Sequence, residues 1–169
     1  MTRRPTIFGL VAGSCLAVSA AAHADDCADL MTGTLGGAAM PVSVTMTMQA
    51  PGGKPETSRS VFTGTQLYVQ VGGQWRSMPM TAKDMIDQVH ESDRGAKKIC
   101  HRIGSDTVHG QAATVYTAHV EHQGSIDDNK VWIANLPKRV LKSDTQIAGG
   151  QHIMAEYDYD HVQPPEGVQ

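Results

Sequence analysis

The sequence predicts a mainly β protein of the α+β class, in which a meandering antiparallel sheet is accompanied by one principal helix. Short stretches of alternating apolar and polar residues recur along the chain, separated by Gly- and Pro-containing turns, which is the pattern of antiparallel strands. Aromatic residues make up only 5% of the chain, whereas Val, Thr, Gly and Met are plentiful, and this favours a sheet over a helix bundle. One segment, residues 82–91, has the apolar spacing of a helix.

The first 24 residues have the features of a secretory signal peptide. Arg3 and Arg4 give a basic start, residues 7–22 are mostly apolar, and Ala22-His23-Ala24 is a small-x-small cleavage site. The apolar run is shorter than the ~20 residues of a transmembrane helix. Cys15 lies in a poor context for lipid attachment, so we predict cleavage rather than a lipid anchor.

Residues 25–169 are then expected to form a single domain, which is long enough to bury a core. The full chain carries 14 basic and 17 acidic residues, for a net charge of −3, and loss of the signal peptide removes basic residues alone. An acidic protein is poorly suited to hold polyanions, so we expect no nucleic-acid partner. No later apolar run could cross a membrane, so we expect an exported product without a transmembrane segment.

Two cysteines remain after the signal peptide, Cys27 and Cys100. In an oxidising compartment the simplest expectation is that they pair. The alternative is a redox-active or metal-binding pair, but the chain has no Cys-x-x-Cys motif, and neither cysteine has the context of a stable thiolate. We therefore predict a structural disulfide.

The expected elements follow the periodicity and the turns in chain order. A short first helix over 25–32 is expected to end at Gly33, Gly36 and Gly37. Thr81 and Asp84 have the spacing of a capping box at the start of the main helix. Strands are expected at 42–48, 56–63, 66–71, 74–76, 97–103, 111–121, 130–134, 138–146 and 152–161, with a turn region over 104–110 and a hairpin loop over 122–129.

The order of these elements resembles the lipoprotein-carrier (LolA/LolB-like) superfamily of periplasmic proteins. The resemblance covers nearly the whole mature chain and rests on a set of short motifs: Gly72-Gly73-Gln74-Trp75 before Met-Pro and a helix, Cys100, Gly104, Val108-x-Gly110, Tyr116, Val131-Trp132-Ile133, Leu136-Pro137 and Tyr157-Asp158-Tyr159-Asp160-His161-Val162-x-Pro164.

The resemblance implies a curled antiparallel sheet that forms a half-open β-barrel. The main helix and a short N-terminal helix would lie against its concave face, and the protein would be periplasmic. It also implies an apolar or lipidic ligand between sheet and helix. This chain has no arginine over 42–48 and no lipidation site of its own, which argues against lipoprotein transport and favours a divergent member with another ligand.

The candidate ligand-binding residues are apolar side chains on the predicted strands and the main helix. They are Val42, Val44, Met46, Met48, Leu67, Val69, Trp75, Met85, Ile86, Val89, Trp132, Ile153 and Tyr157. Methionine suits an adaptable cavity because its side chain is flexible and polarisable. The alternative is that the same residues form a filled core, which would leave a structural or protein-interaction role. An envelope protein that exchanges the ligand is a further possible partner.

A second alternative is a periplasmic copper site. Met46 with Met48, and Met78 with Met80, are Met-x-Met pairs whose thioethers suit Cu(I). The histidines at 119 and 122 point to opposite faces if they lie on a strand. The carboxylates at 127–128 and 158–160 are too few for calcium. We therefore predict no metal ligands and no cofactor.

Catalytic motifs are missing from the sequence. It contains no Gly-x-Ser-x-Gly elbow, no Gly-rich phosphate loop and no His-Glu-x-x-His. Asp158 and Asp160 would share one face of the last strand and could in principle do acid/base work. However, such pairs are far more often solvated carboxylates on the surface. The sequence therefore predicts a protein that is not an enzyme and has no catalytic residues.

Overall fold

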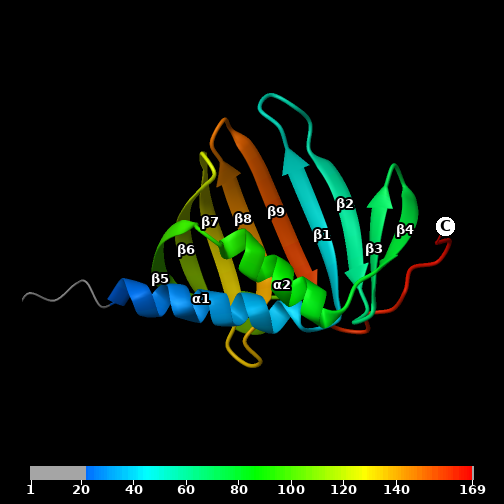
Figure 1. Ribbon diagram of the computed structural model, residues 1–169, viewed down its shortest axis with the longest axis horizontal. Helices are drawn as coiled ribbons and strands as arrows, with labels where there is room; N and C mark the ends of the chain where they lie inside the picture. The colour runs from blue at the N-terminus through cyan, green and yellow to red at the C-terminus, as the bar shows by residue number, and fades with distance from the viewer. Residues whose placement is uncertain (1–21, 169) are drawn as a thin grey trace, which may run out of the picture.

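The computed structural model describes residues 22–168, which form one nine-stranded sheet and two helices (Figure 1). The helices are α1 (Ala22–Ala38) and α2 (Ala82–Asp93). The strands are β1 (Val42–Gln49), β2 (Glu56–Phe62), β3 (Gln66–Val71), β4 (Gln74–Pro79), β5 (Lys97–Val108), β6 (Gln111–His122), β7 (Ser125–Ala134), β8 (Val140–Ile147) and β9 (Gln151–Asp158). The predicted signal peptide lies outside the described residues, except for its last three, which begin α1.

The sheet consists of two antiparallel meanders joined side by side. Its strand order is β4-β3-β2-β1-β9-β8-β7-β6-β5. One meander consists of strands β1 to β4 and the other of strands β5 to β9, and short turns connect the consecutive strands within each. The two meanders meet where β1 pairs with β9, with Val44 opposite Tyr157. The predicted mainly β fold is confirmed.

The connection from β4 to β5 crosses the concave face of the curled sheet. These strands form opposite edges of the sheet, and nine strands spaced ~4.8 Å apart would separate the edges by roughly 38 Å if the sheet were flat. The connection contains α2 and five other residues, which span roughly 40 Å only when those five residues are fully extended and in line with the helix. Curling of the sheet brings its edges within easier reach of the connection, and the face that α2 crosses is the concave one. Figure 1 shows both helices on it.

Cross-strand pairing assigns each side chain to one of the two faces, because directly opposite residues point the same way. The concave face carries Cys100, which is bonded to α1, and the residues in register with it. The convex face carries the alternate residues. On β1, for example, Val44 pairs with Ser60 and Tyr157 on the concave face, whereas Thr45 pairs with Arg59 and Glu156 on the convex face.

Each face has a small core of its own. Under α1, the concave face buries Tyr116, Ile133 and Val140, with Leu30 of the helix packed against them. The convex core is covered by Tyr159, which follows β9 and donates its hydroxyl to the carbonyl of Val140 (2.8 Å). It consists of Val108, Ala113, Val115, Trp132, Ala134 and Leu141.

The predicted end of the first helix at its glycines is wrong, because α1 continues through all three to Ala38. The glycines allow α1 to approach the sheet closely. A Cβ atom at Gly33 would lie 2.6 Å from the Ile133 side chain, and one at Gly36 would lie 2.2 Å from the Lys138 carbonyl oxygen. A Cβ at Gly37 would lie 2.6 Å from the Tyr159 hydroxyl. The glycines therefore serve packing here, and their low helix propensity is overridden by tertiary contacts.

Two other boundaries differ from the prediction. The segment 104–110 was expected to be a turn region, but β5 continues through it to Val108, with a bulge between Arg102 and Gly104. The expected loop over 122–129 is much shorter, because β7 already begins at Ser125. The bulge absorbs one extra residue without ending the strand, which sequence periodicity alone reads as a break.

The capping box and the disulfide are confirmed. The Asp84 amide donates to the Thr81 hydroxyl (3.2 Å), and the Thr81 amide donates back to the Asp84 carboxylate (2.7 Å). The Thr81 hydroxyl also donates to the Asp84 carboxylate (2.7 Å), and this bond, together with the one from the Thr81 amide, holds the pKa of Asp84 below its usual value. Cys27 and Cys100 form a disulfide with a Cα–Cα distance of 5.1 Å, which links α1 to β5 across 73 positions in the sequence.

Candidate ligand-binding site on the concave face

Eight of the sequence-predicted site residues lie on one continuous part of the concave face. The register places Val44 opposite Tyr157 and Met48 opposite Ile153, while Ser60 of β2 connects Val44 to Val69 of β3. The eight residues are Val42, Val44, Met46, Met48, Leu67, Val69, Ile153 and Tyr157. Period-two alternation on separate strands was sufficient to group them.

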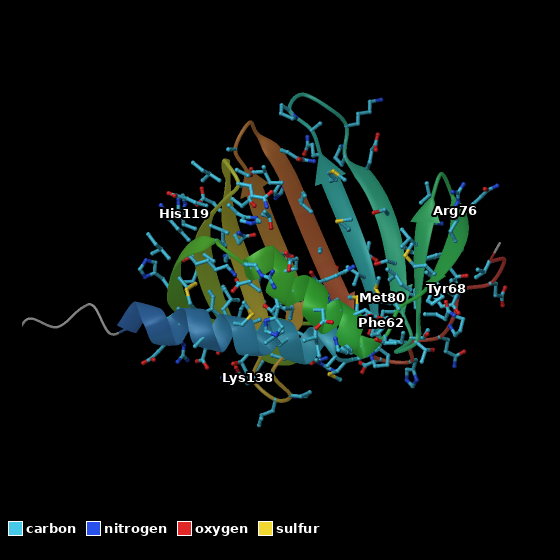
Figure 2. All side chains as sticks on the ribbon, viewed as in Figure 1. Phe62, Tyr68, Arg76, Met80, His119 and Lys138 are labelled. Carbon is cyan, nitrogen blue, oxygen red and sulfur yellow. A yellow bond between two sulfur atoms is a disulfide. The ribbon has the colours of Figure 1, made fainter. Side chains whose placement is uncertain are left out.

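Most of this apolar surface stays accessible. Val42 is buried with 5% exposure, and the other seven are half-buried or exposed. Met48 reaches 37% exposure, and the neighbouring Val71 and Met78 on β3 and β4 reach 54% and 44%. Phe62, at the lower end of β2 (Figure 2), is 1% exposed, so the face is closed at this end of β1 and β2. On β4 it stays open at the same end, because Met78 is in register with Phe62 through Leu67.

Helix α2 crosses the concave face without sealing it. None of its residues is buried, and the predicted site residues Met85, Ile86 and Val89 are half-buried. In the part of the chain that the structure describes, α2 packs against α1 and against no strand to a comparable extent. Its apolar side chains therefore keep surface that a packed core helix would have lost.

A half-open cleft of about 430 Å³ lies between α1, the C-terminal half of α2 and strands β5 to β7. Of the sequence-predicted residues, Val89 alone lines it. The lining is mostly apolar: Cys27, Ala28, Leu30, Met31, Thr34, Val89, Ser92, Asp93, Lys98, Cys100, Ala118, Val120, Asn129 and Val131. Most of these residues were not predicted from the sequence, although Ala118 and Val120 alternate on β6 with the polar His119 and Glu121, which is a pattern that could have identified them.

Polar groups that line the cleft have partners within the protein. The Lys98 ammonium pairs with the Asp93 carboxylate, and the Lys98 side chain is 28% exposed. Burial lowers the pKa of Lys98 below its usual value, because the charged form loses hydration. Asn129 accepts a hydrogen bond from the Thr145 hydroxyl (2.7 Å). A ligand in the cleft would therefore meet apolar walls and a few polar groups, as is usual for small-molecule sites.

Helix α1 forms a fixed wall of the cleft. Besides the disulfide, the Asp29 carboxylate accepts hydrogen bonds from the Lys138 ammonium (2.6 Å) and the Tyr116 hydroxyl (3.4 Å). The Lys138 contact is the main cause of the lowered pKa of Asp29. Figure 2 shows Lys138 in the loop that follows β7, next to α1. Asp26 also accepts a hydrogen bond from the backbone amide of Arg102 (2.9 Å).

The structure does not bring Trp75 and Trp132 together with the other predicted site residues. Trp75 pairs with Gln70, and Trp132 with Val115, in the register of the convex face. The Trp132 indole donates to the Asp106 carboxylate (2.9 Å), and the ammonium of Lys130 lies 4.8 Å from the ring centroid. The two tryptophans therefore lie on the convex face, away from the apolar surface of β1, β3 and β9.

The potential metal ligands are also dispersed. Met46 and Met48 lie on the concave face, whereas His119 lies on the convex face and His122 on the concave face. The His119 ring bonds Asp128 (2.7 Å), which raises the pKa of His119. Among residues 22–168 there is no group of three or more His, Cys, Asp or Glu side chains suited to hold a metal ion. This arrangement does not favour the copper alternative.

A second cavity, of about 490 Å³, lies on the convex face and is polar. Its lining includes Arg59, His109, Glu156, Asp158 and Asp160. Lys142 lies 3.9 Å and His109 lies 3.8 Å from the Glu156 carboxylate. Charged groups of both signs already pair across this cavity, so it does not match an apolar ligand.

No protein-family model matches the chain, and no curated protein matches it either. Among solved structures, LprF from Mycobacterium bovis is 12% identical with a TM-score of 0.45, covering 86% of this chain and 95% of its own. A LolA superfamily protein from Nitrosomonas europaea is 9% identical with a TM-score of 0.31, covering 82% and 92%. A DUF1329 family protein from Desulfovibrio piger is 11% identical with a TM-score of 0.30, also covering 82% and 92%.

At identities of 9–12% and these TM-scores, no ligand or role can be transferred from the solved structures. The architecture that the sequence resemblance implied is nevertheless present in the chain itself. Its sheet is curled and open, and two helices lie on the concave face (Figure 1). None of the helices within 22–168 has the length and apolar character needed to span a membrane.

Proposed function

We propose that this chain is an exported, periplasmic, non-catalytic protein that holds an apolar or lipidic ligand against its concave face. The observation that carries the proposal is that two apolar surfaces face the same space without packing tightly. One is the concave side of β1, β3 and β9, and the other is α2, which has no buried residue. Half-exposed apolar surface of this extent is typical of a ligand-binding face.

A filled core would look different. In the cores of this molecule, Phe62, Ile133 and Leu141 are 1–3% exposed, whereas Met46, Leu67 and Ile153 remain half-buried. Complete burial of such a side chain contributes about 1.5–3 kcal/mol relative to full exposure, and a half-buried side chain has realised only part of this free energy. The concave face of β1, β3 and β9 therefore has free energy available for binding that the structure alone does not use.

The test is to export the full chain to a bacterial periplasm, purify it without detergent, and measure its mass by native mass spectrometry. Solvent extraction and lipid analysis of the same sample then identify any bound molecule. We expect an added mass that solvent recovers as lipid. Protein at its bare mass, after export in a lipid-replete cell, contradicts the proposal.

Two variants of β1 provide a matched pair for this test. Met46→Asp places a carboxylate on the concave face, where burying it beneath a lipid is costly, so we expect most of the bound lipid to be lost. Thr47→Asp makes the same change one residue later on the convex face, and we expect it to retain the lipid. Equal retention by both variants contradicts a site on the concave face.

A further inference from the structure

Lys98 is the one cationic side chain among the described residues that line the cleft between α1, α2 and β5 to β7. It pairs with Val120 in the register of the concave face, so its aliphatic stem lies along the apolar wall formed by β5 and β6. Its ammonium group contacts Asp93, the single carboxylate of the lining. The cleft therefore combines apolar walls with one localised positive charge.

The present partner of Lys98 is poorly placed to hold a negative charge. Asp93 is the last residue of α2, and the C-terminal end of a helix carries a partial negative charge that disfavours a carboxylate. Asp93 is also on a helix that packs mainly on α1. An anion supplied by a ligand would not be subject to the dipole of α2 and could replace Asp93 beside Lys98.

We infer that the cleft takes a long-chain fatty acid, with its hydrocarbon chain against the apolar lining and its carboxylate beside Lys98 in place of Asp93. This inference rests on the proposed function, specifies the ligand class and places the ligand on the β5 to β7 side of the concave face, where the Met46→Asp variant does not test it. The volume of about 430 Å³ is near the lower end of the roughly 300–1,000 Å³ of small-molecule sites, which fits a single chain. Half-burial of the Lys98 ammonium, which lowers its pKa, strengthens the attraction of a second anion.

The experiment compares two ligands of equal chain length, palmitic acid and the neutral hexadecanol, by displacement of a fluorescent probe from the purified full-length protein. Lys98→Met removes the charge and keeps a linear side chain. A charge-assisted contact contributes about 1.5–3 kcal/mol, so we expect at least roughly tenfold weaker palmitate binding and unchanged hexadecanol binding. Lys97→Met is the matched control, because Lys97 is an exposed neighbour on the convex face.

Asp93→Asn tests the exchange from the other side. It removes the competing carboxylate, so we expect palmitate to bind several-fold more tightly and hexadecanol to bind as before. Asp87→Asn is the control, because Asp87 is an exposed residue of α2 that pairs with Lys83 outside the cleft. Melting curves of all four variants establish that each one is folded.

The outcomes separate this inference from the proposed function. If wild-type protein binds both ligands and Lys98→Met weakens neither or both equally, the role of Lys98 is wrong and apolar binding stands. If palmitate binding weakens selectively, the inference is supported. If wild-type protein binds neither ligand while its native mass shows another lipid, the fatty-acid assignment is wrong. If no lipid is found by either method, both proposals fail.

Discussion

Gly36 occupies a position in α1 where no other residue fits without movement. Its hypothetical Cβ would lie 2.2 Å from the carbonyl oxygen of Lys138, and a backbone atom cannot turn aside as a side-chain tip can. The same residue also places its ammonium group beside Asp29, which lies two helical turns before Gly36 on the same side of α1. A glycine and an ion pair thus fix the distance between α1 and the sheet, and with it the width of the cleft.

The residue-scale prediction concerns Gly36→Ala. From helix propensity alone, this change would stabilise the folded protein by about 1 kcal/mol. Because the added methyl group meets backbone, we expect the free energy of unfolding to fall by about 1–3 kcal/mol instead, as in overpacked cores. Urea denaturation measures the change. Thr32→Ala, at an exposed position of the same helix, serves as the control and should shift stability by about 0.5 kcal/mol or less. A more stable Gly36→Ala protein would refute the close approach of α1.

At the scale of elements, the disulfide gives α1 a covalent attachment to an edge strand. Helix α1 packs mainly on β5, and β5 is otherwise held by β6 alone, at the edge of the sheet. The Cys27–Cys100 bond and the hydrogen bond from the Arg102 amide to Asp26 lie two residues apart on this strand. Together they hold the first half of α1 against β5 while its second half packs through the glycines.

The element-scale prediction concerns loss of the disulfide. In the chain-entropy account, a bond that closes a loop of 73 positions stabilises the fold by about 4 kcal/mol, less any native strain. The double variant Cys27→Ser/Cys100→Ser, which leaves no unpaired thiol in the mature domain, should therefore melt well below the oxidised protein. Reduced wild-type protein should melt with the variant. Identical melting of oxidised and reduced protein, or two alkylatable thiols in the exported protein, would show that the bond is not formed.

The elements also show which features the sequence predicts and which it does not. Alternation predicts the strands and assigns Val44, Met46 and Met48 to one face, because that pattern is local. The continuation of β5 past Gly104 could not be predicted in this way. A bulge at Ile103 inserts one extra residue into the strand, and this interrupts the alternation on which the prediction depends. The cleft is missed because it depends on how closely α1 approaches β5 to β7, which is a tertiary distance. Lys98 looks like any surface lysine until that approach is known.

At the scale of the whole molecule, the two faces of the curled sheet are unequal. The segment that contains α2 joins the two edges of the nine-stranded sheet across the concave face. The concave face receives both helices and the accessible apolar surface. The convex face receives the Trp132 core, the tail residue Tyr159 and most of the paired histidines and carboxylates. Val168, near the chain end, bridges to Trp75 on the edge strand β4.

This division of faces leads to a prediction about tryptophan fluorescence. Bromine atoms quench tryptophan on contact, and both native tryptophans lie on the convex face. A dibrominated stearic acid bound on the concave face should therefore leave the emission of the wild-type protein nearly unchanged. In a Met31→Trp variant, the new indole would lie in the wall of the cleft formed by α1, and its emission should fall as the same ligand is added. Unbrominated stearic acid controls for changes in conformation. Strong quenching of wild-type protein would place the ligand on the convex side instead and would remove the concave face from consideration as the binding surface.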